Sequence, residues 1–100
     1  MNLLRVWGEG VLPADSFYEE CNRRGLLVWQ EFMTGNGMDF PLDDPAYRAN
    51  LTAEIVDEIQ RLRNHPSVFM WCGGNEHYLG LPSENPVNPK SPAGRELFQS

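Results

Sequence analysis

Three short apolar segments of this chain each end in a tryptophan that is followed closely by a carboxylic acid. The pairs are Trp7 with Glu9, Trp29 with Glu31, and Trp71 with Glu76. If the segments are parallel strands, their carboxyl ends meet at one edge of the sheet and gather rings and carboxylates there. Indole rings offer a flat apolar surface to the C–H face of a sugar, and carboxylates accept hydrogen bonds from its hydroxyls. The pattern therefore predicts a carbohydrate site at the strand ends.

Asn75 and Glu76 follow the third segment and are the strongest candidates for chemistry. A glycosidase needs a carboxylic acid that keeps its proton near neutral pH and donates it to the leaving oxygen. Partial burial against an aromatic ring raises a carboxyl pKa, and Trp71 lies five residues before Glu76. Asn75 would offer its amide to a sugar hydroxyl. The alternative is that both residues only cap a loop after Gly73 and Gly74.

Arg5 is a charged residue inside an apolar segment, where an unpaired charge is costly. Its guanidinium either orients a carboxylate at the strand end or forms a salt bridge with no catalytic duty. Glu9 and Glu31 either bind sugar hydroxyls or are solvated loop acids. A single tryptophan is more often a core residue than a ligand platform, but three at equivalent positions favour a binding site.

The sequence does not favour a metal or an organic cofactor. Cys72 and His77 are a close pair, but a transition-metal site needs three or four ligands. The Gly8-Glu9-Gly10 turn lacks the third glycine of a dinucleotide fingerprint and places an anion where a pyrophosphate would bind. Cys21 and Cys72 are too few to define a disulfide framework. We therefore predict no metal, no cofactor and two free thiols.

Hydrophobic periodicity predicts the order β-α-β-α-β over residues 1–80. Continuous apolar runs, typical of buried parallel strands, predict strands at 3–6, 26–29 and 68–71. The first helix is expected to begin at a capping box of Ser16 and Glu19, with Asp15 as the competing cap, and to end at Gly25.

The second helix is expected to begin at Asp44, with Pro45 in its first position. Its apolar stripe, widened by Val56, is Leu51, Ile55, Ile59 and Leu62. Strands that alternate with helices imply parallel pairing through right-handed crossovers. A doubly wound sheet and part of a (β/α)8 barrel both fit, and the missing dinucleotide fingerprint favours the barrel.

Composition excludes several classes of partner. A net charge of −6, from 14 acidic and 8 basic residues, argues against nucleic acid and against an anionic membrane surface. No apolar run approaches the roughly 20 residues that span a bilayer. We expect residues 1–100 to be a fragment of a larger domain, with a core at 1–80 and a proline-rich loop at 81–100. The compartment stays open.

Together, residues 2–10, 27–33 and 62–76 resemble the catalytic barrel of glycoside hydrolase family 2, and most closely its β-mannosidase branch. The resemblance covers nearly all of residues 1–80. It implies an α/β fold that is a partial (β/α)8 barrel holding strands two to four. It also implies a retaining exo-β-glycosidase that releases terminal β-linked mannose through a covalent glycosyl-enzyme, without a metal in the chemical step.

The same resemblance implies a role for individual residues. Glu76 matches the general acid/base, Asn75 matches a sugar-binding residue, and Arg5 matches an arginine that helps to hold the nucleophile. Trp7 and the Gln30-Glu31 segment match positions that line the pocket for the terminal sugar. The nucleophile itself belongs to a late strand, and no residue of this chain is assigned to it.

Three alternatives to a β-mannosidase remain. Glu9 stands where the branch usually has glycine, and Gly74 where it usually has asparagine, so the sugar could be a galactoside, glucuronide or glucosaminide. A non-catalytic carbohydrate-binding remnant and a structural fragment without a ligand are the other two. We expect the isolated chain to be inactive, because a closed barrel takes about 250 residues.

Overall fold

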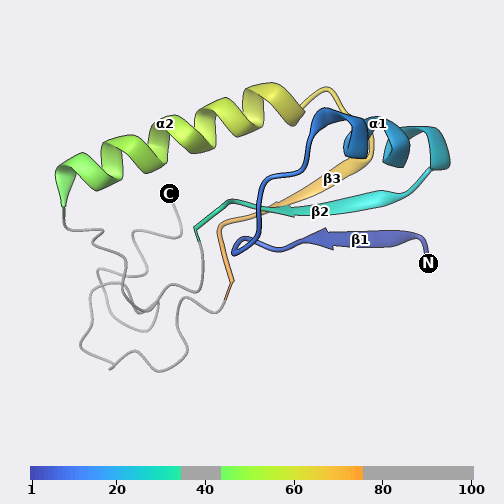
Figure 1. Ribbon diagram of the computed structural model, residues 1–100, viewed down its shortest axis with the longest axis horizontal. Helices are drawn as coiled ribbons and strands as arrows, with labels where there is room; N and C mark the ends of the chain where they lie inside the picture. Colours follow the sequence, from blue (N-terminus) through green and yellow to red (C-terminus); the bar gives the residue numbers. More distant parts are fainter. Residues whose placement is uncertain (35–43, 76–100) are drawn as a thin grey trace.

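The computed structural model describes residues 1–34 and 44–75, and these form three strands and two helices (Figure 1). In chain order they are β1 (Leu3–Val6), α1 (Asp15–Arg24), β2 (Leu27–Glu31), α2 (Pro45–Leu62) and β3 (Val68–Cys72). The strands form one sheet in the order β1-β2-β3, and both neighbouring pairs are parallel. The predicted element order and parallel pairing are confirmed.

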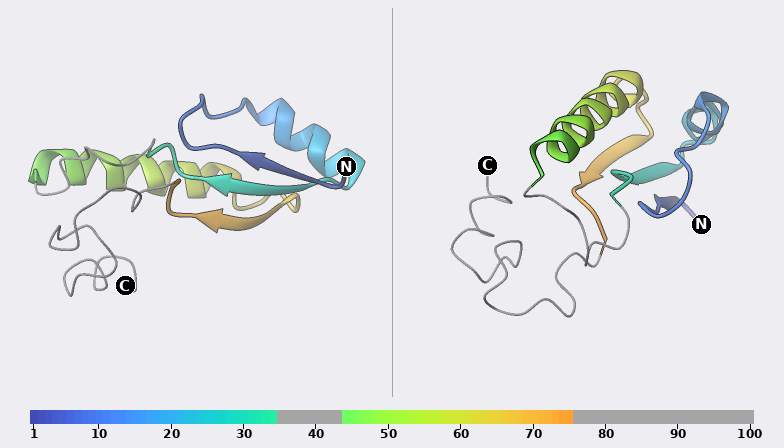
Figure 2. Two further views of the ribbon diagram at one scale, coloured as in Figure 1. Left: turned by 90° about the horizontal axis from the view of Figure 1, so that it is seen from below. Right: turned by 60° about the vertical axis from the view of Figure 1, so that its left-hand side comes forward.

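Both helices lie on the same face of this sheet (Figure 2). Spatial order equals chain order, so each right-handed crossover advances in the same direction and places its helix on the same side. A doubly wound sheet reverses direction and carries helices on both faces. The described residues are consecutive βα units that advance in one direction, as in a (β/α)8 barrel with the helices outside.

The start of α1 corrects a prediction from the sequence. The N-cap is Ala14, with φ −66° and ψ 156° and no side-chain capping hydrogen bond, so Ser16 lies inside the helix and the predicted capping box is wrong. Asp15 occupies the first turn, where its charge suits the helix dipole, and it pairs with Arg61 of α2 at 3.1 Å. Gly25 ends the helix as predicted, in a left-handed conformation with φ 67°.

The start of α2 is as predicted. The Asp44 side chain accepts a hydrogen bond from the Ala46 amide at 2.8 Å, and Pro45 opens the helix. Of the predicted apolar stripe only Leu62 is fully buried, and Val56 is 46% exposed.

Glu58 instead occupies a buried position on the inner face of α2. The hydrophobic core lies between the helices and the sheet and consists of Val6, Tyr18, Cys21, Val28 and Leu62. Neither described helix has the length and apolar character needed to cross a membrane.

Candidate active site

Side chains alternate across β2, so its carboxyl end presents different groups to the two faces of the sheet. Gln30 points toward the helices, where its Oε1 accepts a hydrogen bond from the Tyr18 hydroxyl at 2.7 Å. Trp29 and Glu31 therefore belong to the opposite face, which neither α1 nor α2 covers. We call this the open face.

Arg5 of β1 joins the carboxyl ends of all three strands. It stands in register with Trp29 and so shares the open face. Its guanidinium forms an ion pair with Glu31 Oε1 and donates through Nη2 to Asn75 Oδ1 at 2.5 Å. Asn75 comes just after β3. We call Arg5, Glu31 and Asn75 the arginine cluster, and it realises the salt bridge that the sequence suggested as one interpretation of Arg5.

The second oxygen of Glu31 is bound by the turn after β1. The Gly8 amide donates to Glu31 Oε2 at 2.9 Å, and the Glu31 side chain is fully buried. A Cβ atom on Gly8 would lie 2.5 Å from the Phe32 carbonyl oxygen, so only glycine allows this approach. Both carboxylate oxygens of Glu31 are thus held within the chain. The sugar-binding role expected of Glu31 stays a prediction, as does that of the exposed Glu9.

Two of the three tryptophans lie near the arginine cluster. The Trp29 ring lies beneath the Arg5 guanidinium, with 5.2 Å from Arg5 Cζ to the ring centroid. Its buried Nε1 has no hydrogen-bond partner among residues 1–34 and 44–75. Trp7 follows β1 directly and is 47% exposed. Both positions are compatible with the predicted stacking on a sugar.

Trp71 lies on the other face of the sheet. An irregularity between Val28 and Trp29 leaves Phe69 without a partner in the β2–β3 register, so Gln30 pairs with Trp71. One extra residue exchanges the faces of every side chain beyond it. Trp71 consequently packs against the core and stacks on Phe32 with the centroids 5.5 Å apart. Trp71 thus lies at the predicted end of the sheet, but on the face opposite to Arg5 and Trp29.

Comparison with known proteins identifies the family. The sequence profile described as "Glycosyl hydrolases family 2, TIM barrel domain" matches residues 16–86. The chain belongs to this family. The β-mannosidase of Mus musculus is 40% identical over 81 residues, which cover 81% of this chain and 9% of the mouse protein. Beta-mannosidase B of Thermothelomyces thermophilus is 42% identical over 82 residues, which cover 82% of this chain and 9% of the fungal protein.

A solved structure agrees with these relatives. The crystal structure of the β-D-mannosidase from Dictyoglomus thermophilum superimposes with a TM-score of 0.67 and 45% sequence identity, over 74% of this chain and 9% of that chain. The chain therefore spans about 9% of the length of the relatives that it matches. The sheet and helices described above are part of a family 2 barrel.

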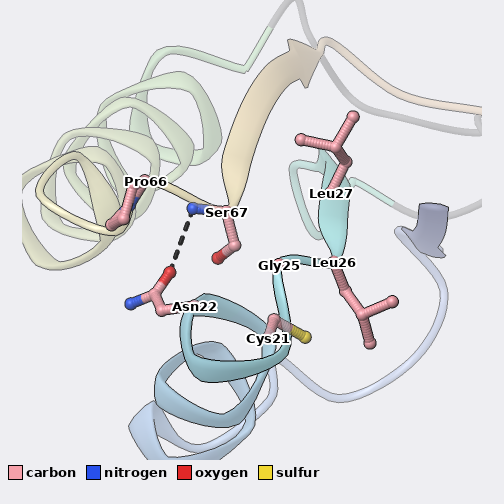
Figure 3. Close-up of a pocket in the computed structure, with 7 residues that line it drawn as sticks. All are labelled: Cys21, Asn22, Gly25, Leu26, Leu27, Pro66 and Ser67. Carbon is pink, nitrogen blue, oxygen red and sulfur yellow. Dashed lines mark hydrogen bonds between the residues drawn. The ribbon is translucent and has the colours of Figure 1, made fainter. Parts of the chain in front are cut away.

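Barrels of this type bind substrates at the carboxyl ends of their strands, which is where the arginine cluster lies. A hollow of about 130 Å³ lies at the opposite, amino end of β2 and β3, next to Cys21, Leu26 and Ser67 (Figure 3). There the Asn22 side chain accepts a hydrogen bond from the Ser67 amide at 3.0 Å. We therefore assign the candidate active site to the arginine cluster.

Several sequence predictions concern residues outside the described ranges. Glu76, His77 and the loop at 81–100 fall there, so their predicted roles stay predictions. Within residues 1–34 and 44–75, no three His, Cys, Asp or Glu side chains lie close enough to hold a metal ion.

Sequence reasoning missed a polar group behind the site. Glu58, Tyr18 and Gln30 are buried together between the helices and β2. The apolar stripe predicted for α2 does not include Glu58, and no polar role was predicted for Tyr18. The available signal was the position of Glu58, three residues after Ile55 and four before Leu62, which places it on the inner face of α2.

Proposed function

We propose that this chain supplies part of the active site of a retaining β-glycosidase of the β-mannosidase type. The observation that carries the proposal is the arginine cluster, in which one guanidinium connects groups from three adjacent parallel strands beside Trp29. The relatives that match this chain at about 40% identity are β-mannosidases. The cluster lies at the end of the sheet where a family 2 barrel would bind its substrate.

The chemical steps assign one role to each residue. Glu76 protonates the glycosidic oxygen as the bond to the terminal sugar breaks, and then accepts a proton from the water that releases the sugar. Asn75 binds a sugar hydroxyl, whereas Glu31, which is fully buried with both oxygens bound by Arg5 and the Gly8 amide, holds Arg5 in place. Trp7 and Trp29 are the aromatic contacts. Trp71 is not among them, because it packs against the core on the other face of the sheet. The nucleophile is a carboxylate from a strand that this chain does not contain.

Arg5 orients that nucleophile. A guanidinium has five N–H donors in a planar fork, which suffices for Glu31, Asn75 and one further carboxylate. The Arg5 side chain is 43% exposed although its Glu31 partner is fully buried, so part of its surface remains available on the open face. No metal or organic cofactor takes part.

Two other functions remain candidates. The exposed Glu9 in the turn after β1 adds a carboxylate there, which favours a galactoside or a glucosaminide as the alternative sugar and would repel the carboxylate of a glucuronide. The second candidate, a non-catalytic carbohydrate-binding remnant, would use Trp7 and Trp29 as sugar platforms without the chemical steps.

A chimera tests the proposal in a closed barrel. The D. thermophilum β-mannosidase would carry the matching residues of this chain in place of its own barrel segment. We expect it to cleave an aryl β-mannoside faster than the corresponding galactoside, glucuronide and glucosaminide. Glu76→Gln should lower kcat by about 10³-fold and leave sugar binding unchanged.

Glu54→Gln is the matched control, because Glu54 is an exposed glutamate on α2. It should leave kcat unaffected. Unchanged turnover in the Glu76→Gln chimera would contradict the role of Glu76, and preference for another glycoside would replace the sugar. The isolated chain should show no turnover, since three strands cannot close a barrel.

A further inference from the structure

A buried polar group lies directly behind the arginine cluster, on the helix-covered face of β2. Its members are Tyr18 from α1, Gln30 from β2 and Glu58 from α2. Tyr18 and Gln30 are fully buried and Glu58 is 2% exposed. Polar side chains at this depth are costly unless hydrogen-bonded, so their arrangement calls for a physical account.

Two hydrogen bonds connect this group to the strand that carries Glu31. The Tyr18 hydroxyl donates to Gln30 Oε1 at 2.7 Å, and Gln30 Nε2 donates to the Glu31 backbone oxygen at 2.8 Å. On the other face of the same residue, the Glu31 carboxylate holds Arg5 and the Gly8 amide. A shift of the Gln30 side chain would therefore be transmitted through Glu31 to the arginine cluster.

Glu58 is the third member, and its two carboxyl oxygens have no hydrogen-bond partner within the described part of the chain. Burial raises the pKa of both Glu58 and Tyr18; the Glu58 charge adds to the rise at Tyr18, and the Gln30 amide opposes the rise at Glu58. A neutral carboxylic acid has one donor and one acceptor. The donor matches the Tyr18 oxygen, which can still accept a hydrogen bond, and the acceptor matches the second N–H of the Gln30 amide.

We propose that Glu58 is a positioning residue for the candidate active site, which in its neutral form fixes Tyr18 and Gln30 and, through Glu31, the arginine cluster. Ionisation removes the donor to Tyr18 and loosens that support. The catalytic consequence rests on the proposed function, whereas the coupling between Glu58 and the cluster does not.

The groups around Glu58 set where it exchanges its proton. Burial raises the pKa of Glu58 to about 7, with a smaller contribution from Glu54, while Gln30 and Arg61 oppose the shift. The Arg61 guanidinium already has other partners: it pairs with Asp15 at 3.1 Å and donates to the Pro13 carbonyl at 2.7 Å. The His65 ring centroid also lies 5.5 Å from that of Tyr18, and Asp15 and Cys21 contribute to the raised pKa of Tyr18.

An NMR titration of the chain itself measures the coupling. The reporters are the Gly8 backbone amide and the Arg5 Nε–H, both of which donate to the Glu31 carboxylate, observed with the ¹³C shift of the Glu58 carboxyl between pH 5 and 9. We expect all three signals to change with one midpoint near 7. In Glu58→Gln, an isosteric mimic of the neutral acid, the two reporters should stay at their low-pH positions.

The control variant is Glu54→Gln, which should retain the wild-type titration. Reporters that stay constant while the Glu58 carboxyl titrates would overturn the proposal. So would a titration that survives Glu58→Gln, since it would belong to another group. Tyr18→Phe provides a second variant: it removes the acceptor for Glu58 and should reduce the amplitude at Gly8 and Arg5.

The catalytic consequence is measured separately in the chimera described above. Its kcat/KM should fall by about threefold or more between pH 6 and 8.5, and Glu58→Gln should flatten that decline while leaving kcat at pH 6 within twofold. A decline that persists unchanged in Glu58→Gln would refute the positioning role. An inactive chimera with coupled NMR reporters would count against the proposed function and leave the coupling intact.

Discussion

The two faces of β2 carry polar groups of opposite character at the same height in the sheet. On the helix-covered face, Tyr18, Gln30 and Glu58 are buried, and no ion pair links them. On the open face, Glu31 is equally buried but carries its charge against Arg5. A buried charge needs a partner, and on the helix-covered face Arg61 is already paired with Asp15 and the Pro13 carbonyl. The comparison indicates that a neutral network supports a charged site through the thickness of one strand.

The largest expected effect is on the pH dependence of stability, because raising the pH ionises Glu58 on the helix-covered face, where Arg61 is already paired with Asp15. The pKa of Glu58 is raised from 4.5 to about 7 in the folded chain, so the neutral form is favoured by folding. The stabilisation is complete below pH 4.5 and is lost as the pH rises to about 7, with a total on the order of 3 kcal/mol.

Urea unfolding of the chain and of Glu58→Gln between pH 4.5 and 8 measures this effect. The wild-type chain should lose stability relative to Glu58→Gln across that range. A constant difference between the two would show that Glu58 has the same proton affinity in the folded and unfolded chain.

The turn that closes over Glu31 should give the next largest effect. In Gly8→Ala the new methyl group would lie 2.5 Å from the Phe32 carbonyl oxygen, and a backbone atom cannot rotate away. We expect a loss of roughly 2–3 kcal/mol in the free energy of unfolding, because the Gly8 amide must withdraw from Glu31. Gly73→Ala is the control, since a Cβ there meets nothing within 4 Å. Equal stability of the two variants would show that the approach of Gly8 to β2 is unimportant.

Removing the negative charge of Glu31 on the open face should have a smaller effect on the free energy of unfolding. Glu31→Gln keeps an acceptor for Arg5 but removes the buried charge, and the partly exposed guanidinium can return to water. We expect a loss of about 1–2 kcal/mol, measured by urea unfolding at pH 7. Glu20→Gln removes a surface ion pair with Arg23 and should give no measurable change. If both variants behave alike, burial does not distinguish the Glu31 pair from a surface pair.

Much of the fold was predictable because its signals are local. Asp44 and Pro45 mark the start of α2, Gly25 marks the end of α1, and the apolar runs predict the strands. The start of α1 was not predictable from the capping pattern, because Asp15 gains an ion pair with Arg61 from a distant helix. Tertiary contacts decided that boundary.

The site was predictable only in part, for a geometric reason. Alternation alone places Arg5, Trp29 and Glu31 on one face, as observed. Alternation fails for Trp71, since the unpaired Phe69 reverses the faces beyond it, and no local residue pattern announces that irregularity. The burial of Glu58 was not predicted for another reason. A charged residue is normally expected to be exposed, and the neutral state of Glu58 depends on neighbours from other elements.

The guanidinium that touches all three strands makes the site sensitive to strand alignment. Sliding any strand by one residue would displace its contribution by about 3.3 Å and turn it to the wrong side. Arg5 would then lose Glu31 or Asn75 altogether. A sheet with one strand out of register would lack this site altogether, rather than have a weakened one. Molecules that fold with one strand out of register would be inactive. The activity of a sample would therefore report the fraction of molecules whose strands are in register.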